Sequence, residues 1–221
     1  MTSLDIRDEL VGADIASGLV AGALIHPDKT ALSFEERNLT FVQLTTRIQQ
    51  VAALARQDLG LQPGDCAAIY APNCLPYIEL VAGLSRAGIM VATPTHRSAP
   101  QELNQILANC RAKVVFCPDD LRKNLKGHVV FSLDEGYEEA LAGQLLSDPV
   151  PPSDKNATFL YTLHLRHHWR AQRRYAFTPR ASSSICSHGP PFPLPWAGRS
   201  ASLFCPSSSR RGLWVRYVQC L

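Results

Sequence analysis

Residues 65–73 read Asp-Cys-Ala-Ala-Ile-Tyr-Ala-Pro-Asn, and the architecture of the chain follows from them. The run from Cys66 to Ala71 has no charged residue, which is typical of a parallel strand that is covered on both faces. Turn residues bound the run, with Gln62-Pro63-Gly64-Asp65 before it and Pro72-Asn73 after it. We therefore expect a strand that is buried on both faces here.

Upstream of this strand, apolar residues recur at helical spacing over residues 8–25 and again over residues 41–59. The second helix is expected to begin at Thr40, because Gln43 follows three residues later as in a capping box. Its apolar stripe consists of Leu44, Ile48, Val51, Leu54 and Ala55, and it ends before Gly60. A short strand is expected at residues 30–34, followed by a turn at residues 36–38.

Downstream, strands and helices continue to alternate. A helix is expected over residues 75–87, closed by Gly88, and another is expected to begin with Ser98 as its N-cap and Pro100 in its first turn. Strands are expected at residues 89–94, 113–117 and 129–133. A polar, Pro-rich connector over residues 148–156 leads into a further strand at 157–162, Ala-Thr-Phe-Leu-Tyr-Thr. The alternation predicts an α/β fold, a parallel sheet with flanking helices.

The composition changes abruptly after Thr162. Residues 1–162 carry 13 basic and 19 acidic side chains, whereas residues 163–221 carry nine arginines and no Lys, Asp or Glu. All three tryptophans, at 169, 196 and 214, lie in the second part, which is rich in Ser, Pro and Arg. We therefore predict a folded part over residues 8–162 and a disordered, basic tail over residues 163–221.

The remaining composition favours a soluble, cytoplasmic protein. None of the seven cysteines forms a C-x-x-C pair, and residues 1–10 mix charged with apolar residues, unlike a secretory leader. The uncharged apolar run from Ile15 to Ile25 is too short to span a bilayer, which needs about 20 residues. We expect no membrane span.

Several short motifs occur in a characteristic order over residues 8–162. They are His26-Pro27-Asp28-Lys29-Thr30-Ala31, Leu39-Thr40-Phe41-Val42-Gln43-Leu44, Gly60-Leu61-Gln62-Pro63-Gly64-Asp65, Ala71-Pro72-Asn73, Ala87-Gly88, Pro94, Pro100-Gln101-Glu102-Leu103 and Ala112-Lys113-Val114-Val115. In order and spacing this part resembles the start of the AMP-forming adenylating enzymes, which comprise acyl-CoA synthetases, aryl-CoA ligases and the adenylation domains of peptide synthetases.

The resemblance implies a two-step reaction in the intact family. A carboxylic acid reacts with ATP, assisted by Mg²⁺, to give an acyl-adenylate, and a thiol such as coenzyme A then takes the acyl group. In that family a strand like residues 157–162 runs into the loop Thr-Ser-Gly-Thr-Thr-Gly-x-Pro-Lys-Gly, whose backbone N–H groups and lysine bind the phosphates. In this chain Leu163-His164-Leu165-Arg166-His167-His168-Trp169-Arg170 follows instead. The family's later adenine, ribose and lysine motifs are also missing.

The missing loop is recoverable in another reading frame. In this frame, each new codon consists of the last two bases of one codon, from Thr162 onward, and the first base of the next codon. Trp169 has only the codon TGG and the Arg170 codon begins with C or A, so the new codon at this position encodes glycine. One consistent choice of codons for residues 162–179 then reads Leu-Cys-Thr-Ser-Gly-Thr-Thr-Gly-Ala-Pro-Lys-Gly-Val-Met-Leu-Ser-Pro-Arg. We therefore predict a shift of reading frame close to residues 160–163, with residues 163–221 translated out of frame.

The histidines and arginines of the second part allow two other interpretations. His164, His167 and His168 with Cys186 or His188 suggest a metal site, but their spacing fits no standard zinc pattern. Arginines interleaved with Trp and Tyr suggest nucleic-acid binding through phosphate contacts and stacking. We expect neither a metal site nor a specific nucleic-acid partner.

Polar residues of the first part provide no clear catalytic set. His96-Arg97 follows a strand end, where it lies either near a substrate cleft or in a solvated loop. Asp119-Asp120 and the acidic residues of 135–139 read as solvated turn and helix-end charges rather than a carboxylate pair. We therefore assign no catalytic, cofactor-binding or metal residues.

Three functions remain open from the sequence. The first is a truncated and inactive member of the adenylating family, for which no cofactor is expected although the intact family uses ATP, Mg²⁺ and coenzyme A. The second is a non-catalytic binding protein with a basic, nucleic-acid-contacting tail. The third is a fragment of a peptide-synthetase adenylation domain.

Overall fold

The fold is built on a six-stranded sheet. The computed structural model describes residues 14–144, 150–151, 160–165 and 172–177. Within them the strand order is β6 (Val130–Ser132), β5 (Ala112–Cys117), β3 (Cys66–Ile69), β4 (Met90–Ala92), β7 (Leu160–Leu165) and β8 (Gln172–Phe177). The first five strands are parallel, which confirms the predicted α/β class with flanking helices, whereas β8 runs antiparallel to β7.

The central strand β3 is apolar throughout because both of its faces are covered. Ala67 and Ile69 pack into one core cluster and Cys66 and Ala68 pack into another on the opposite face. All four side chains are at most 3% exposed. The strand ends at Ile69, two residues before the end of the predicted run, although the Tyr70 N–H still donates to the Phe116 carbonyl at 2.9 Å and Tyr70 and Ala71 remain buried.

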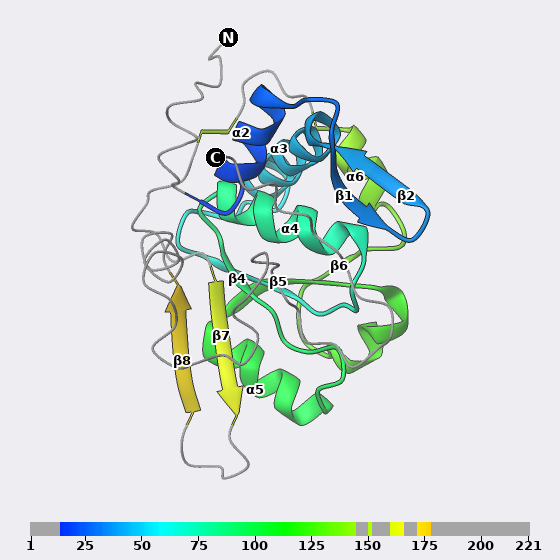
Figure 1. The fold of residues 1–221 in the computed structure, drawn as a ribbon. Helices are drawn as coiled ribbons and strands as arrows, with labels where there is room; N and C mark the ends of the chain where they lie inside the picture. The colour runs from blue at the N-terminus through cyan, green and yellow to red at the C-terminus, as the bar shows by residue number, and fades with distance from the viewer. Residues whose placement is uncertain (1–13, 145–149, 152–159, 166–171, 178–221) are drawn as a thin grey trace, which may run out of the picture.

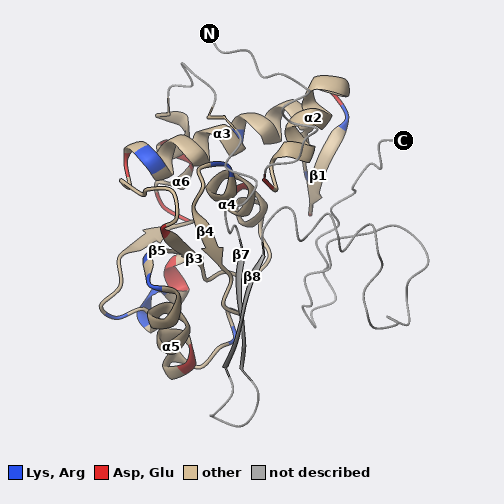
Figure 2. Ribbon diagram, turned by 90° about the vertical axis from the view of Figure 1, so that its left-hand side faces the viewer, with Lys and Arg blue, Asp and Glu red and all other residues tan. Residues whose placement is uncertain are grey.

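Helices lie on both faces of the sheet. Figures 1 and 2 show α3 (Phe41–Gln57), α4 (Leu75–Arg86) and α6 (Tyr137–Ala142) on one side and α5 (Pro100–Cys110) on the other. The larger core cluster lies between the sheet and the first group, and the smaller one lies under α5. The connections explain this arrangement, since α4 joins β3 to β4 and α5 crosses back from β4 to β5.

The helix α3 begins as its sequence predicts. The Thr40 backbone N–H donates to Gln43 Oε1 at 2.9 Å, and the Gln43 N–H donates to Thr40 Oγ1 at 3.3 Å, forming a complete capping box. The apolar stripe of α3 is buried against α4. This packing is close, because a Cβ added to Gly83 of α4 would lie 2.5 Å from Val51 Cβ.

A third apolar cluster joins α2 (Ser17–Ile25) and a small hairpin to the helical layer. The hairpin consists of β1 (Thr30–Phe34) and β2 (Arg37–Thr40), which are antiparallel. The turn predicted over residues 36–38 is confirmed only at Glu36, because Arg37 and Asn38 already pair with β1 and the turn includes Glu35, which adopts φ 52°. Of the predicted helix at 8–25, residues 17–25 are helical, and residues 8–13 lie outside the described residues.

The predicted N-cap of α5 was also wrong. The cap is Ala99, which makes no side-chain cap hydrogen bond, and the buried Ser98 hydroxyl has no partner within the described structure. Ser98 instead donates its backbone N–H to the carbonyl of Thr95 in a turn after β4. Pro100 and Glu102 lie in the first turn as predicted.

The strands β7 and β8 cross the boundary predicted at residue 162. β7 continues to Leu165, and β8 covers Gln172–Phe177, so these residues of the predicted tail form strands rather than disordered chain. Residues 166–171 and 178–221 lie outside the described residues. No helix in the described part of the chain is long and apolar enough to cross a bilayer.

Candidate functional site

The candidate site is the edge of the sheet at which the parallel strands end. The adjacent strands β3 and β5 connect onward in opposite directions, because β3 leads to β4 on one side and β5 leads to β6 on the other, so the strand order reverses between β5 and β3. Open α/β sheets bind ligands in the crevice beyond the carboxyl ends of the strands at such a reversal. Residues 70–74 and 93–99 follow β3 and β4 and therefore lie at this edge.

A hydrogen-bonded group ties these connections together. The hydroxyl of the buried Tyr70 donates to the backbone carbonyl of His96 at 3.2 Å. Asn124 Nδ2 in turn donates to the Tyr70 hydroxyl oxygen at 3.2 Å. The loops after β3 and β4 and the 3-10 turn η1 (Asp119–Asn124) are thereby held in a fixed relation at the candidate edge.

The charged residues singled out in the sequence are spread around this edge. His96 is half-buried and Arg97 is exposed in the turn after β4. Asp119 and Asp120 are both exposed in η1, as expected of solvated turn charges, and the Asp119 N–H donates to Asp134 Oδ2 at 2.7 Å. These side chains are not brought together as a catalytic pair.

The next strand along the edge, β7, leads to the position at which the family resemblance implies a phosphate loop. β7 lies beside β4, with Val91 opposite Leu160 and Ala92 opposite Tyr161, and β8 returns antiparallel to it (Figure 1). The intervening residues 166–171, with His167 and His168, lie outside the described residues, as do Cys186 and His188. Elsewhere in the described ranges no three His, Cys, Asp or Glu side chains are grouped as metal ligands.

Sequence reasoning missed a cluster of charged residues that the described part of the chain forms in the helical layer. The guanidinium of Arg47 on α3 contacts Glu79 of α4 through Nε–Oε1 at 2.6 Å and Glu138 of α6 through Nη1–Oε2 at 2.8 Å. The Tyr137 hydroxyl donates to Glu79 Oε2 at 2.9 Å. These residues are far apart in sequence, so no local motif signals the cluster.

The cluster shifts the pKa of Glu138 and of Tyr137 in opposite directions. Hydrogen bonding with Arg47 lowers the pKa of Glu138. Burial, followed by the charge of Glu79, raises the pKa of Tyr137, so its hydroxyl stays a donor. Since Glu79 is fully buried and paired, this cluster serves to join three helices rather than to carry out chemistry.

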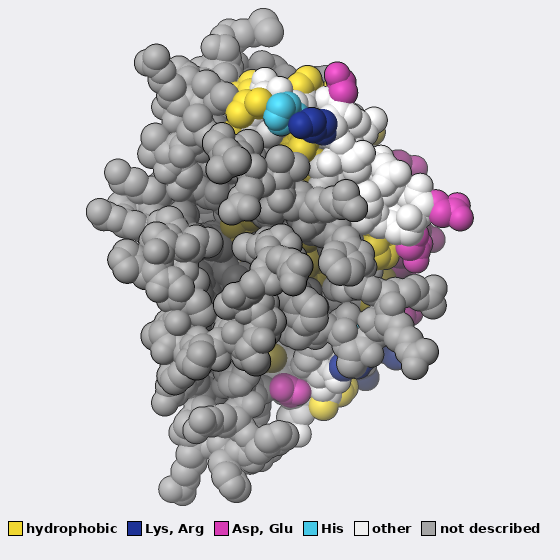
Figure 3. All heavy atoms as spheres, in the orientation of Figure 1, with side chains coloured by type: hydrophobic (Ala, Val, Ile, Leu, Met, Phe, Trp, Pro, Cys, Tyr) yellow, Lys and Arg dark blue, Asp and Glu magenta, His cyan; other side chains and the backbone are white. Residues whose placement is uncertain are grey.

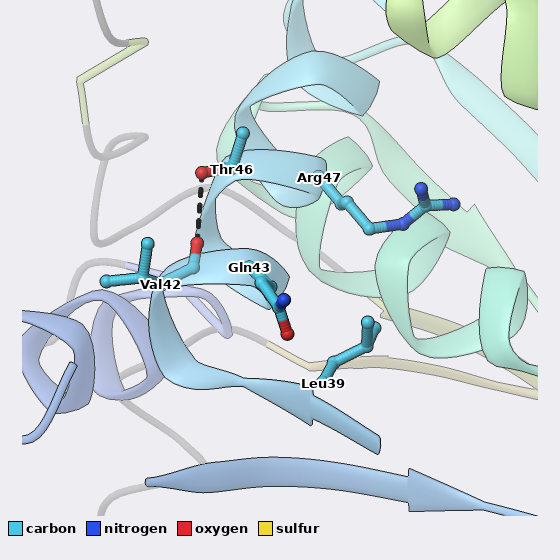
Figure 4. Close-up of a pocket in the computed structure, with 5 residues that line it drawn as sticks. All are labelled: Leu39, Val42, Gln43, Thr46 and Arg47. Carbon is cyan, nitrogen blue, oxygen red and sulfur yellow. Dashed lines mark hydrogen bonds between the residues drawn. The ribbon is translucent and has the colours of Figure 1, made fainter. Parts of the chain in front are cut away.

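A surface pocket lies next to this cluster but offers little for catalysis. Figure 4 shows its lining from the end of β2 and the first turns of α3, namely Leu39, Val42, Gln43, Thr46 and Arg47. The Thr46 hydroxyl donates to the Val42 carbonyl at 3.0 Å, and Gln43 is used by the capping box. No carboxylate, histidine or cysteine lines it, so the candidate site remains the strand edge.

Apolar side chains are exposed near this pocket. Leu24 and Ile25 end α2 at 43% and 42% exposure, and Val42 is 46% exposed. Figure 3 shows hydrophobic side chains gathered near α2 at the top of the described surface, with acidic side chains along the right-hand rim. This patch is separate from the carboxyl edge of the sheet.

Comparisons with known proteins agree with this architecture. The family described as "AMP-binding enzyme" matches residues 21–162. The chain is 28% identical to the putative acyl-CoA synthetase YngI of Bacillus subtilis over 146 residues, which is 65% of this chain and 26% of the relative. It is 33% identical to the pyochelin synthase PchD of Pseudomonas aeruginosa over 197 residues, covering 78% of this chain and 36% of the relative.

Solved structures share the fold. The structure of a Mycobacterium tuberculosis fatty acyl CoA synthetase superposes with a TM-score of 0.69 at 20% identity, covering 83% of this chain and 38% of the other. The curated relatives are much longer than this chain. The match to the rat long-chain fatty acid transport protein 2, for example, covers only 16% of that protein. Over residues 21–162, in sequence and in fold, the chain belongs to the family of AMP-binding adenylating enzymes.

Proposed function

We propose that this chain derives from an adenylate-forming acid–thiol ligase and, as encoded, does not catalyse adenylation. The main support for this proposal is the sequence between β7 and β8. It reads Arg166-His167-His168-Trp169-Arg170-Ala171 and contains no glycine, serine or threonine. Close approach of backbone N–H groups to phosphates needs small residues, and glycine above all. The residues present therefore do not fit the phosphates of ATP.

The positions of β7 and β8 support a shift of reading frame as the cause of the missing phosphate loop. In the shifted frame, residues 166–171 correspond to Gly-Thr-Thr-Gly-Ala-Pro and residues 172–177 to Lys-Gly-Val-Met-Leu-Ser. The glycine-rich part of the recovered loop thus coincides with the connection between β7 and β8. Residues 163–221 then carry no selected function of their own.

In the intact lineage we propose activation of a carboxylic acid with ATP and Mg²⁺, followed by transfer to a thiol. Coenzyme A is the first candidate thiol, because relatives of this chain include CoA ligases from Bacillus subtilis and Yersinia pestis. A carrier-protein thiol is the second candidate. The pyochelin synthase match supports it, because this match covers 78% of the chain. A cytoplasmic location fits either reaction and stays a proposal.

Two measurements test this proposal. The nucleotide sequence across codons 155–185 should encode the phosphate loop in the neighbouring frame, and codons that do not encode it would overturn the frame argument. The purified chain should show no pyrophosphate exchange into ATP with a panel of aliphatic and aromatic carboxylic acids. Exchange above a no-acid control would refute the loss of activity, and a gene with the frame restored serves as the matched positive control.

The rival function, a binding protein with a basic nucleic-acid-contacting tail, is tested by the same DNA. If the tail were selected for nucleic-acid binding, its gene should not encode a phosphate loop in the neighbouring reading frame. Salt-sensitive binding to RNA or DNA alone does not support it, because nine arginines without acidic residues attract any polyanion.

A further inference from the structure

The outer edge of β6 is open to another strand. β6 (Val130–Ser132) is the end strand of the sheet, on the side away from β8, and β5 is its only pairing partner among the described strands (Figure 1). Val129, which precedes β6, is 68% exposed and is the most exposed of the large hydrophobic residues in the described part of the chain. An unpaired strand edge presents backbone N–H and C=O groups that pair readily with a strand of another molecule.

The hydrogen bonds to β5 show which backbone groups of β6 face outward. The Val129 carbonyl accepts from a β5 N–H at 2.9 Å, and the Leu133 N–H donates to a β5 carbonyl at 3.0 Å. Successive residues of a strand direct their backbone groups to opposite sides. The N–H and C=O groups of Val130 and Ser132 therefore face away from β5, toward the outer edge.

We propose that two copies of this chain associate through β6, with the two β6 strands antiparallel about a two-fold axis at Phe131. Val130 of each copy then lies opposite the partner's Ser132, and the two residues exchange backbone hydrogen bonds. The sheet continues across the axis from one copy into the other. This association does not depend on any adenylating activity.

The same register gives the exposed Val129 an apolar neighbour. Residues at equal distances from Phe131 lie opposite each other, so Val129 lies opposite the partner's Leu133 and on the same face of the joined sheet. Phe131 and Leu133 already pack against the core cluster under α3 and α4. The association therefore extends an apolar row that is partly buried within each copy.

The charges beside β6 favour a second copy as the partner. The exposed Lys123 and Lys126 precede the strand, and the exposed Asp134 and Glu135 follow it. Antiparallel pairing brings the basic end of one strand to the acidic end of the other, on both sides of the axis. Parallel pairing of the same strands would bring like charges together, so the pattern favours the two-fold arrangement.

Sedimentation equilibrium of the full chain tests the association. Because the strand is short, we expect a weak dimer with a dissociation constant on the order of 100 µM, weakened further by salt. In amide hydrogen exchange followed by NMR, the amides of Val130 and Ser132 should exchange severalfold more slowly at dimer-forming concentrations than in the dilute protein.

Charge reversals at the two ends of β6 give matched variants. Lys126→Glu and Glu135→Lys should each raise the dissociation constant about fivefold, because each places like charges together at both ends of the paired strands. The double variant exchanges the two charges and should restore the original affinity. Lys29→Glu, at an exposed site on β1's side of the helical layer, is the control and should leave the affinity unchanged.

The unsubstituted chain decides the proposal even if a variant fails to fold. A monomer throughout a series up to about 500 µM, several times the expected dissociation constant, would overturn it. A dimer that leaves the exchange of the Val130 and Ser132 amides unchanged would overturn it as well, because that dimer would use another surface. Assembly beyond the dimer would also contradict it, since a two-fold pairing of β6 is closed.

Discussion

Arg47 connects three helices through two carboxylates. The Arg47 side chain is 18% exposed, and its guanidinium contacts the fully buried Glu79 and the exposed Glu138 at the same time. Removing such a cation leaves a buried carboxylate with only the Tyr137 hydroxyl as a partner in this cluster. A buried charge that loses its partner is among the costliest single changes in a protein.

We therefore predict that Arg47→Met lowers the free energy of unfolding by about 3–5 kcal/mol. Urea denaturation followed by circular dichroism measures this change. Arg56→Met is the matched control, since Arg56 is exposed near the end of the same helix, and it should change stability by about 0.5 kcal/mol or less. Equal losses in both variants would contradict the role given to the buried pair.

The Glu138 carboxylate makes part of this stability dependent on pH. Hydrogen bonding with Arg47 lowers its folded pKa below the ordinary value of 4.5. A lowered carboxyl pKa contributes stability that is present above the unfolded value and is lost as the pH falls through the folded value. The contribution is small, because the Glu138 side chain is 59% exposed and screened by solvent.

The expected outcome is a stability difference between the unsubstituted chain and Glu138→Gln that is present at pH 6 and shrinks below about pH 4.5. Thermal melts across this range measure the difference. Glu139→Gln, an exposed neighbour on the same helix, serves as the control. A difference that grows as the pH falls would have the wrong sign and would contradict the pairing.

At the scale of secondary-structure elements, the start and the buried face of α3 could be predicted from the local sequence. Its capping box and buried stripe were both predicted from the sequence, because the Thr40–Gln43 pair and the apolar spacing act within a few residues. The strand β2 was missed because Arg37 and Asn38 are polar and exposed, and only pairing with β1 makes them a strand. Ser98 resembled a cap by residue type, yet the turn with Thr95 places the helix start one residue later.

We predict that Thr40→Ala destabilises the chain by about 0.5–2 kcal/mol, because the N–H of Gln43 loses its acceptor. Chemical denaturation at neutral pH measures this loss. Thr46→Ala is the control, since Thr46 is exposed on the same helix and its hydroxyl only donates to a carbonyl within the helix. A loss for Thr46→Ala equal to that for Thr40→Ala would contradict a specific capping effect.

At the scale of the whole molecule, the connection between α6 and β7 is held by the side of α3. Gln49 accepts from the Val150 N–H at 2.8 Å and donates to the Val150 carbonyl at 3.4 Å, although the two residues are far apart in sequence. Gln144 adds a bond to Asp58 Oδ2 at 2.7 Å. These contacts anchor Gln144 and Val150 to α3 and to its C-cap residue Asp58.

Gln49→Ala should therefore release this connection and speed proteolytic cleavage next to Val150 several-fold, with a smaller effect on global stability. Limited proteolysis with a nonspecific protease and mass spectrometry of the fragments measures the cleavage rate. Gln50→Ala, the neighbouring half-buried glutamine on α3, is the matched control. Unchanged cleavage at Val150 in Gln49→Ala would show that its side chain does not hold the connection.

The sequence by itself determined the α/β class, the buried strand that begins at Cys66 and the capped helix, because apolar spacing and capping are local properties. It also determined that residues 166–171 do not match the phosphate loop of the family, since this comparison depends only on residue types and codons. The tertiary structure alone decided the strand order, the antiparallel β8 and the reversal between β5 and β3. It also decided the Arg47 cluster, because this cluster joins residues that only the packed helices bring together.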